Sequence, residues 1–427
     1  MKESFLHFIW SLQYFAKKDL LSNQQEPIEI LHPGTMNTDA GPDFLNARIR
    51  IGGIEWIGNV EVHKQSSDWF LHHHQDDQAY SNVILHVVYK HDKEIVRRDG
   101  TLIPTIELQG RISQELILKY SRLVNSPETI PCSSYLRDIE RITQVSAKEN
   151  ALFKRLSRKA GEVKELLIRN KNDWEETAYQ ILARNFGFKV NSEPFFRLST
   201  GLPYKIISRH RQNIFKLEAL LFGQSGLLDK NYEDEYPCQL KKEYEFLSHK
   251  YSIADSKLDA SEWKFLRTRP ANFPSVRIAE FASLISRESS LFSSIIQLEA
   301  PKDIYSFFRI KTSDYWSRHY IFDKEVECGA GMLGKSSIEN LTINSLVPLM
   351  VSYSKEKDEQ VFMQKALDIL EFFPAESNKI ISLLGSHGLE ISNAFDSQAA
   401  LELYNNYCRK KNCLNCNIGT SIVKTVT

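Results

Sequence analysis

Hydrophobic residues in the first hundred positions change their spacing several times, and each change predicts a different element. Apolar side chains recur at helical spacing over residues 3–15. An apolar stretch at 27–31 predicts a short strand, and two runs of alternating polarity, at 45–51 and 54–63, predict two more. Two glycines at 52–53 join these runs, and a Gly-Gly pair in that place is typical of a β-hairpin.

Two further elements complete this first part. Ser67 is placed to cap a short helix over 67–74, and the run VILHVVY at 83–89 predicts a buried central strand. A Pro- and Gly-rich stretch at 32–42 predicts a loop. We therefore expect an α+β protein whose first domain, residues 1–125, has the order α-β-β-β-α-β.

From about residue 134 the apolar spacing is helical almost to the end of the chain. The clearest helical segments are 143–169, 174–186, 211–221, 276–286, 338–353, 359–373 and 397–406. No repeat of fixed period is present, which argues against a solenoid. The stretch 125–131 predicts a boundary, so that a mostly α-helical C-terminal region, residues 133–427, follows with one or two subdomains.

Composition narrows the class of protein. The chain has 427 residues, of which 42% are hydrophobic and 25% charged, as in ordinary multidomain globular proteins. Its 54 basic and 54 acidic residues give no net charge, which argues against a nucleic-acid coat protein but allows a local basic track. No apolar run is long enough to cross a bilayer, and the N-terminus lacks a signal-peptide cleavage site. We therefore expect a cytoplasmic protein without membrane contact.

Two acidic residues lie where a metal site could form. Asp43, in GPDF, directly precedes the first strand of the hairpin, and Glu61, in EVHK, is near the end of the second. Divalent metals that activate water for phosphodiester cleavage prefer carboxylate ligands, and a neighbouring base can take a proton from the water. Residues i and i+2 share a face of a strand, so Glu61 and His63 should point the same way.

This element order, with these residues, resembles the PD-(D/E)xK nuclease superfamily and its restriction-endonuclease-like fold. The resemblance implies that Asp43 and Glu61 hold Mg²⁺ or Mn²⁺, with the Val62 carbonyl as a further ligand. It implies a catalytic role for His63, which stands where the superfamily usually has lysine, or for the adjacent Lys64. Because a histidine holds no permanent charge at neutral pH, an inactive protein that keeps the fold stays the alternative.

The register of the predicted hairpin decides whether the two acids meet. If 52–53 is a tight turn, Phe44 pairs with Glu61, and Asp43 falls on the wrong face. A one-residue bulge, most naturally at 58–59, would bring Asp43 and Glu61 together, and bulges are common next to active sites. We predict such a bulge. The alternative is that Asp43 caps a turn and Glu61 is a solvated strand residue.

Several histidines belong to the same part of the chain: His72, His73, His74 and His86. With His63 and Glu61, His74 could form a site of imidazole and carboxylate groups that suits zinc or manganese. The alternative is that the HHH run ends an exposed helix and that His86 is a hydrogen-bonded core residue.

Three cysteines crowd the last twenty residues, where YCRKKNCLNCNIG has C-x4-C-x2-C spacing. Thiolates at this spacing suit zinc or an iron–sulfur cluster. Cys132 is the best candidate for a fourth ligand, because it would join the two ends of the protein. Some PD-(D/E)xK nucleases carry such a cluster, which implies Cys132, Cys408, Cys413 and Cys416 as its ligands here. Three ordinary thiols are the alternative.

The segment GAGMLGKS at 329–336 matches the phosphate-binding pattern G-x4-G-K-[ST]. That chemistry needs a buried apolar strand before the loop, whereas FDKEVEC is charged. We expect a Gly-rich turn before the helix at 338–353, and nucleotide binding is the third hypothesis for function.

One basic stretch could bind a nucleic acid, which we expect to be DNA. WKFLRTRPANFPSVR places cationic and amide side chains around a Pro-bounded loop, where they can contact phosphate: Arg267, Arg269, Asn272 and Arg277. Acidic residues are interleaved in the other basic stretches, such as 154–171, so a solvated surface is the default there.

The whole chain resembles an uncharacterised bacterial family, known as a domain of unknown function (2851). The resemblance runs through GPDF, EVHK, LHVVY, EALLFGQSGLL, RTRPANFP and the terminal cysteine run. It implies a two-part protein but no activity. From the residues we expect a divalent-metal-dependent nuclease or a nuclease-derived DNA-processing protein. The alternative is a catalytically inactive nucleic-acid-binding or scaffold protein.

Overall fold

The computed structural model describes residues 1–97, 99–266, 268–329 and 332–424, which fold into two compact units. The first, here called the sheet unit, comprises Met1–Ala147, Leu383–Leu389 and Leu403–Thr427. The second, here called the helical unit, comprises Lys148–Ser382 and Glu390–Glu402.

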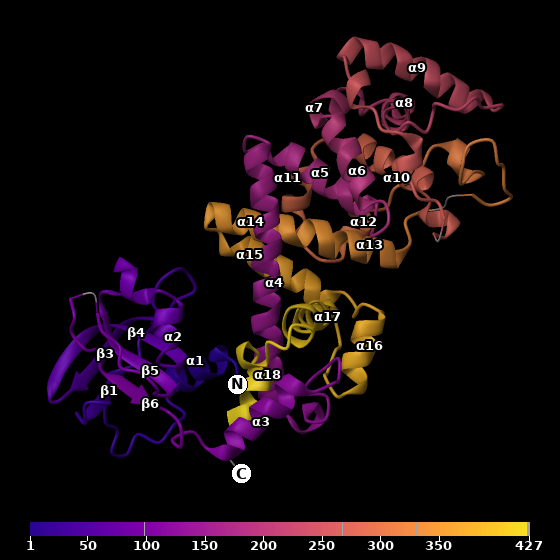
Figure 1. Cartoon of the computed structure of the whole chain (residues 1–427). Coiled ribbons are helices and arrows are strands. Elements are labelled where there is room, and N and C mark those ends of the chain that lie inside the picture. Colours follow the sequence, from indigo (N-terminus) through magenta and orange to yellow (C-terminus); the bar gives the residue numbers. More distant parts are fainter. Residues whose placement is uncertain (98, 267, 330–331, 425–427) are drawn as a thin grey trace. The chain divides into compact units, whose positions relative to one another are not determined.

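The sheet unit is built on a mixed sheet whose strands run in the order β1-β3-β4-β5-β6, with β2 paired to β3 (Figure 1). The strands are β1 (Ile28–His32), β2 (Thr35–Met36), β3 (Phe44–Ile51), β4 (Ile54–Gln65), β5 (Val83–Lys90) and β6 (Thr105–Glu107). β1, β3 and β4 pair antiparallel, whereas β4, β5 and β6 pair parallel. β4 therefore lies between β3 and β5, at the junction of the two pairing modes, and its residues from Gly58 to His63 are largely buried.

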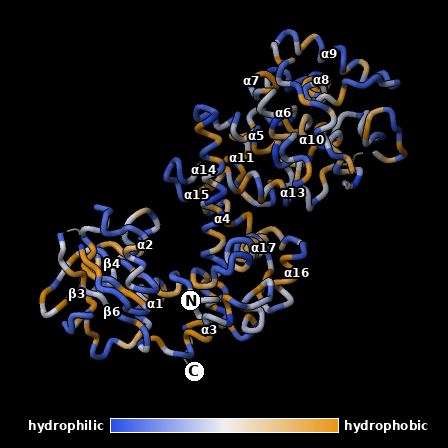
Figure 2. Tube along the Cα trace, viewed as in Figure 1, coloured by the Kyte–Doolittle hydropathy of each residue, from blue (hydrophilic) through white to orange (hydrophobic). Residues whose placement is uncertain are grey.

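Helix α1 (Glu3–Leu12) packs against β4 and β5 and supplies much of the core of the sheet unit. Its apolar side chains at helical spacing, among them Phe5, Ile9 and Trp10, are fully buried. Figure 2 shows hydrophobic residues gathered on α1 and along the strands.

Three short pieces of helix form the crossover that parallel β4 and β5 require. They are α2 (Asp68–Leu71) and two single 3-10 turns, η1 (His74–Asp76) and η2 (Gln78–Tyr80). The unit also contains α3 (Gln114–Asn125), which begins where the Ser113 hydroxyl accepts a hydrogen bond from the Leu116 N–H, and α18 (Asn417–Lys424), which packs on α3.

The helical unit is formed almost entirely of α-helices. They are α4 (Arg141–Arg169, whose first turns belong to the sheet unit), α5 (Trp174–Phe186), α6 (Ser192–Gly201), α7 (Tyr204–Ile207), α8 (Ile214–Gln224), α9 (Glu235–Tyr251), α10 (Pro274–Arg287), α11 (Leu291–Gln297), α12 (Asp303–Phe307), α13 (Lys335–Leu341), α14 (Val347–Lys357), α15 (Gln360–Phe372), α16 (Lys379–Ser386, shared with the sheet unit) and α17 (Ala394–Glu402). A π-helical turn, Thr342–Leu346, joins α13 to α14.

The mixed α+β class with a mostly helical second part is confirmed. Two short strands were not expected: β2 lies in the segment predicted as a loop, and β6 follows the predicted last strand. The Cys-rich segment, which the sequence led us to place with the helical region, groups with the sheet unit instead. Residues 330–331 of the GAGMLGKS segment lie outside the described residues, and Gly334 precedes α13 as its N-cap. None of the described helices is long and apolar enough to cross a membrane.

Candidate metal centre

A bulge in the β3–β4 hairpin sets the register of the candidate site. Near the turn the ladder is regular, with Ala47 opposite Gly58, but further along Phe44 lies opposite Val60. The extra residue is therefore in β3, where Asn46 adopts a left-handed conformation with φ 57°. The predicted bulge is present, but on the strand opposite the predicted position. Asparagine tolerates this backbone region better than most residues do, which explains the place of the bulge.

The bulge brings Asp43 and Glu61 side by side. The Asp43 N–H donates to Glu61 Oε2 at 3.1 Å, and the Val62 N–H donates to Asp43 Oδ2 at 3.0 Å. His7 of α1 adds a third contact, with Nε2 3.3 Å from Asp43 Oδ2. Asp43 is thus held by backbone and imidazole groups at the end of β3. No pattern in the sequence pointed to His7, a single histidine in an apolar helix.

Three histidines converge beside Glu61. His63 Nε2 lies 3.1 Å from His72 Nδ1 and 3.5 Å from Glu61 Oε1, and His74 Nε2 lies 3.3 Å from Glu61 Oε1. One ring nitrogen from each of His63, His72 and His74 lies within 4.8 Å of the other two. Ligands about 2.1 Å from a tetrahedral metal are separated by about 3.4 Å, so these spacings suit one ion. The site contains His72 in addition to the predicted residues.

Strand geometry and the crossover position these side chains. Glu61 and His63 share a face of β4, and the parallel register places His86 of β5 beside Glu61. His72 ends α2 and His74 opens η1, and between them His73 turns the chain with φ 58°. Because of this turn, His73 is exposed whereas His74 is buried.

Aromatic side chains complete the wall of the site. Tyr80 stacks on His74 with ring centroids 3.8 Å apart. Trp69 contacts His74 and His86 edge-on at 5.3 and 5.6 Å. Trp69 is almost fully buried in the core formed with Val83, as expected for a packing residue and not for a base-stacking platform.

Burial sets the protonation states in the site. Burial, together with the neighbouring Asp43 carboxylate, raises the pKa of Glu61 to about 9. Burial lowers the pKa of His63 to about 3 and also lowers the pKa of His74. At neutral pH Glu61 is therefore protonated and both imidazoles are neutral, so their contacts are not ion pairs. Neutral imidazole is the form that binds metals.

His86 lies behind His63 and can fix its tautomer. His63 Nδ1 and His86 Nε2 are 2.8 Å apart, so a proton on His63 Nδ1 leaves Nε2 free to bind a metal. His86 is fully buried, and burial lowers its pKa well below the ordinary value. Among the described residues, its Nδ1 has no hydrogen-bond partner.

The remaining predicted catalytic residue lies apart from this cluster. The side chain of Lys64 is exposed, on the face of β4 opposite to His63. Burial raises the pKa of the Glu3 carboxyl on α1, and the positive charge of Lys64 partly offsets that rise.

The predicted nucleic-acid contacts differ in their surroundings. Arg267 lies outside the described residues, and Arg269 and Asn272 are exposed. Arg277, by contrast, is buried: its Nη1 donates to Glu280 Oε2 at 2.7 Å, and its Nη2 donates to Asn272 Oδ1. Both terminal nitrogens of Arg277 thus bind groups within the fold, so Arg269 and Asn272 are better placed than Arg277 for the predicted phosphate contact.

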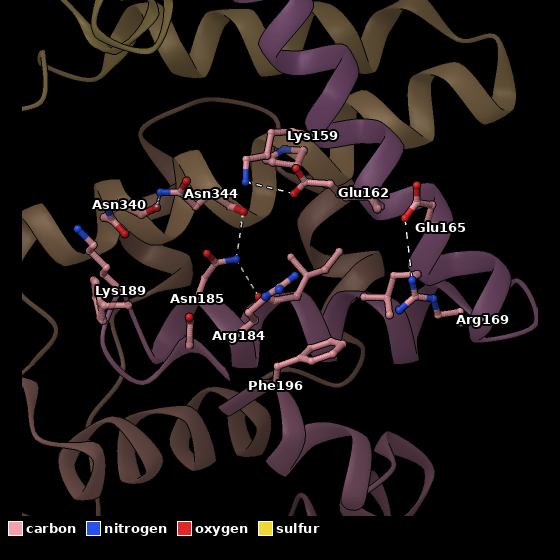
Figure 3. Close-up of a pocket in the computed structure, with 16 residues that line it drawn as sticks. Lys159, Glu162, Glu165, Arg169, Arg184, Asn185, Lys189, Phe196, Asn340 and Asn344 are labelled. Carbon is pink, nitrogen blue, oxygen red and sulfur yellow. Dashed lines mark hydrogen bonds and ion pairs between the residues drawn. The ribbon is translucent and has the colours of Figure 1, made fainter. Parts of the chain in front are cut away.

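A cleft of about 680 Å³ opens in the helical unit beside α4 and α5 (Figure 3). Its charged residues largely pair with one another, as Lys159 does with Glu162 at 3.3 Å and Arg169 with Glu165 at 4.0 Å. Its lining contains no histidine or cysteine. The cleft therefore lacks the imidazole and thiolate ligands that are typical of a transition-metal site.

The comparisons with known proteins give a family without an assigned activity. Residues 3–379 match the profile of a family described as a protein of unknown function (DUF2851). The chain belongs to this family. The DUF2851 match covers every residue of the histidine and carboxylate site and ends before the Cys-rich segment. No curated protein and no solved structure matches the chain.

Proposed function

We propose that this DUF2851 protein is a metal-dependent hydrolase that cleaves phosphodiester bonds in nucleic acid. The observation that carries the proposal is the convergence of ring nitrogens from His63, His72 and His74 beside Glu61. Three protein ligands with space for a fourth are typical of catalytic sites, whereas structural sites are usually closed by four.

The donor set favours zinc or manganese over magnesium. Imidazole nitrogen suits transition metals, whereas Mg²⁺ prefers oxygen ligands in an octahedral arrangement. A divalent ion here would lower the pKa of water and neutralise charge on a phosphate. The ligand set expected from the resemblance, Asp43 and Glu61, is thereby revised: the histidines hold the ion, and the carboxylates stand beside it.

Each carboxylate has a separate task in this proposal. Glu61 Oε1 lies within 3.5 Å of two proposed ligand nitrogens. The charge of a bound ion would favour the carboxylate form of Glu61, which could then accept a proton from water. Asp43 is a positioning residue, since its carboxylate binds the Val62 N–H and its own N–H binds Glu61. The side chains of Glu61 and His63 are only 5% and 2% exposed, whereas His72 is exposed and Asp43 is half-buried. Solvent therefore reaches the site on the side of His72 and Asp43.

Nucleic acid is proposed as the substrate because of the architecture around the site. The order helix, strands, hairpin, crossover helix and parallel strand, with an acid before the hairpin and Glu-x-His at its end, is similar to the PD-(D/E)xK nucleases. In those enzymes a lysine usually stands where this chain has His63. The proposed use of His63 as a metal ligand gives that departure a chemical role.

One observation favours a second function, in which the metal stabilises a binding or scaffold protein. Glu61, His63 and His74 are buried, so an ion among them could serve the fold alone. This alternative predicts metal binding without hydrolysis.

The two functions separate in a cleavage assay. Labelled single- and double-stranded DNA and RNA are incubated with the full chain and Mn²⁺, Zn²⁺ or Mg²⁺. We expect cleavage with Mn²⁺ or Zn²⁺, and a loss of about 10²–10⁴-fold in Glu61→Gln, as for removal of a general base. His73→Asn is the matched control, because it changes the adjacent exposed histidine and suits the left-handed backbone. A protein that binds the metal and cleaves none of these substrates would support the scaffold instead.

A further inference from the structure

A cavity of about 450 Å³ lies within the sheet unit, where α1, α3 and the C-terminal segment meet. Side chains from all three line it, among them Phe8 of α1, Tyr120 of α3 and Cys413 of the Cys-rich segment. Cavities of about 300–1,000 Å³ are the usual size for binding a small ligand. The fold therefore builds, from stretches distant in sequence, a space that a ligand could occupy.

The fixed charges that line this cavity are all positive. They belong to four lysines, and no aspartate or glutamate is among the described residues of the wall: Lys2, Lys410, Lys411 and Lys424. The chain as a whole has 54 basic and 54 acidic residues, so a wall with charges of one sign departs from the average of the sequence. Such a cavity concentrates positive potential and attracts anions.

Neutral groups, and no carboxylates, hold the lysine amines in place. Lys410 Nζ donates to Asn406 Oδ1 at 2.8 Å, and Lys411 Nζ donates to the Ser126 carbonyl at 2.9 Å. Lys424 Nζ lies over an aromatic ring, 5.6 Å from its centre. In the cleft of the helical unit, by contrast, basic side chains pair with glutamates (Figure 3). The charge of the lysine cavity is therefore available to a ligand from outside.

The lysine cavity adjoins the histidine and carboxylate site. His7 lines the cavity, and its Nε2 lies 3.3 Å from Asp43 Oδ2. Met36 of β2 is also in the wall, and the N–H of the next residue, Asn37, donates to the Asp43 carbonyl at 2.7 Å. Two residues of the wall are thus in, or next to, contacts with Asp43, so a ligand in the cavity would lie beside the candidate metal centre.

Phosphate is the ligand chemistry that fits this wall. Lysine ammonium groups bind phosphate oxygens as point charges, and hydroxyl and amide side chains add hydrogen bonds. Besides the lysines, the wall contains such polar side chains at Ser4, Asn412 and Asn415. A nucleic-acid strand carries a phosphate at every nucleotide, so a strand held at the metal centre has further phosphates to place nearby.

We propose that the lysine cavity binds a phosphate group of a nucleic-acid strand held at the neighbouring metal centre. The inference rests on the proposed function for the identity of the ligand, but binding in the cavity requires neither metal nor hydrolysis. It gives the C-terminal segment, which supplies three of the four lysines, a role in substrate binding. This segment lies beyond residue 379, where the match to the family profile ends.

Binding of a labelled single-stranded oligonucleotide to the full chain, without added divalent metal, tests the cavity apart from cleavage. Fluorescence anisotropy gives the affinity at several salt concentrations. The double variant Lys2→Gln/Lys410→Gln changes two exposed side chains of the wall. Its affinity should fall by about 10-fold, and the slope of log K against log salt should become shallower by about 0.7 for each lysine lost.

The matched control is Lys17→Gln/Lys18→Gln, which removes the same charge from two exposed lysines of the sheet unit that do not line the cavity. This control should bind the oligonucleotide as the wild type does. Equal weakening in both double variants would show a general effect of charge and overturn the proposal. Absence of oligonucleotide binding by the wild type would overturn it as well.

Two further arms separate the source of the phosphate and the two proposals. Adenosine monophosphate and inorganic phosphate should displace the oligonucleotide only at far higher concentration than an unlabelled strand does, and a wild type that binds the mononucleotide but no strand would overturn the nucleic-acid assignment. His74→Ala should bind the strand as the wild type does. If no metal supports cleavage while the cavity lysines still determine strand binding, the hydrolase proposal fails and the lysine cavity is supported.

Discussion

Glu61 shows how strongly one buried side chain depends on its surroundings. Burial and Asp43 raise its pKa to about 9, so the metal-free folded protein holds a proton there at neutral pH. In the unfolded chain the carboxyl has its ordinary pKa, near 4.5. As pH rises from about 4.5 to about 9, the unfolded state loses this proton first, and the folded metal-free state loses stability.

A metal ion beside Glu61 reverses this preference. The cation favours the carboxylate and lowers its pKa, so binding at neutral pH should release about one proton per ion. Calorimetry of Mn²⁺ binding in buffers of different ionisation enthalpy measures that number. In Glu61→Gln the release should vanish while Mn²⁺ still binds to the histidines. Equal proton release by both proteins would contradict the assigned position of Glu61.

At the scale of elements, the β3–β4 hairpin decides the site. Alternating polarity and the glycine pair were enough to predict both strands and their turn, and the need to join Asp43 to Glu61 predicted a bulge. The sequence could not place it, because Asn46 and Gly58 are both plausible bulge residues by backbone freedom alone. The observed left-handed Asn46 decides the matter.

The bulge can be tested by a substitution that opposes its backbone. A β-branched residue is strongly disfavoured in the left-handed region, so Asn46→Val should destabilise the fold by about 1–3 kcal/mol. It should also weaken Mn²⁺ binding, since a regular ladder would move Asp43 away from Glu61. Asn46→Gly is the matched control and should retain both properties. Urea denaturation and calorimetry measure them, and a fully tolerated valine would argue against the bulge.

Gly58 of β4 carries a second constraint on the same element. A Cβ there would lie 2.4 Å from Ile84 Cγ2 and 2.7 Å from the Asn82 carbonyl oxygen. We therefore expect Gly58→Ala to destabilise the protein by about 1–3 kcal/mol through overpacking. Gly53→Ala, also at a glycine of the hairpin, meets no atom within 4 Å but has φ 88°. Comparison of the two by urea denaturation separates crowding from backbone strain, and a neutral Gly58→Ala would contradict the close packing.

At the scale of the whole molecule, periodicity was a good guide to class and helices but not to the grouping of distant segments. Helix α5 begins and ends where its apolar spacing predicted. The histidine site required tertiary contacts that no short motif fixes: His7 reaches Asp43 from α1, and His72 and His74 reach β4 from the crossover. Likewise, the pairing of residues 403–427 with the N-terminal stretch depends on long-range packing that local pattern does not record.

Two compact units predict two steps of thermal unfolding. Differential scanning calorimetry should show two transitions, and Gly58→Ala should lower the midpoint of only the one that belongs to the sheet unit. A destabilisation of about 1–3 kcal/mol should lower that midpoint by several degrees. A single transition that shifts as a whole would show that the units unfold together.

The central claim is that three histidines beside Glu61 form a metal centre, and Mn²⁺ titration of the full chain tests it most directly. Mn²⁺ is the suitable probe because thiolates bind it poorly, so the cysteines do not compete. The account predicts one Mn²⁺ per chain for the wild type and for His73→Asn, and a loss of at least about 10-fold in affinity for His74→Ala. Equal binding by all three proteins, or no binding by the wild type, would contradict it.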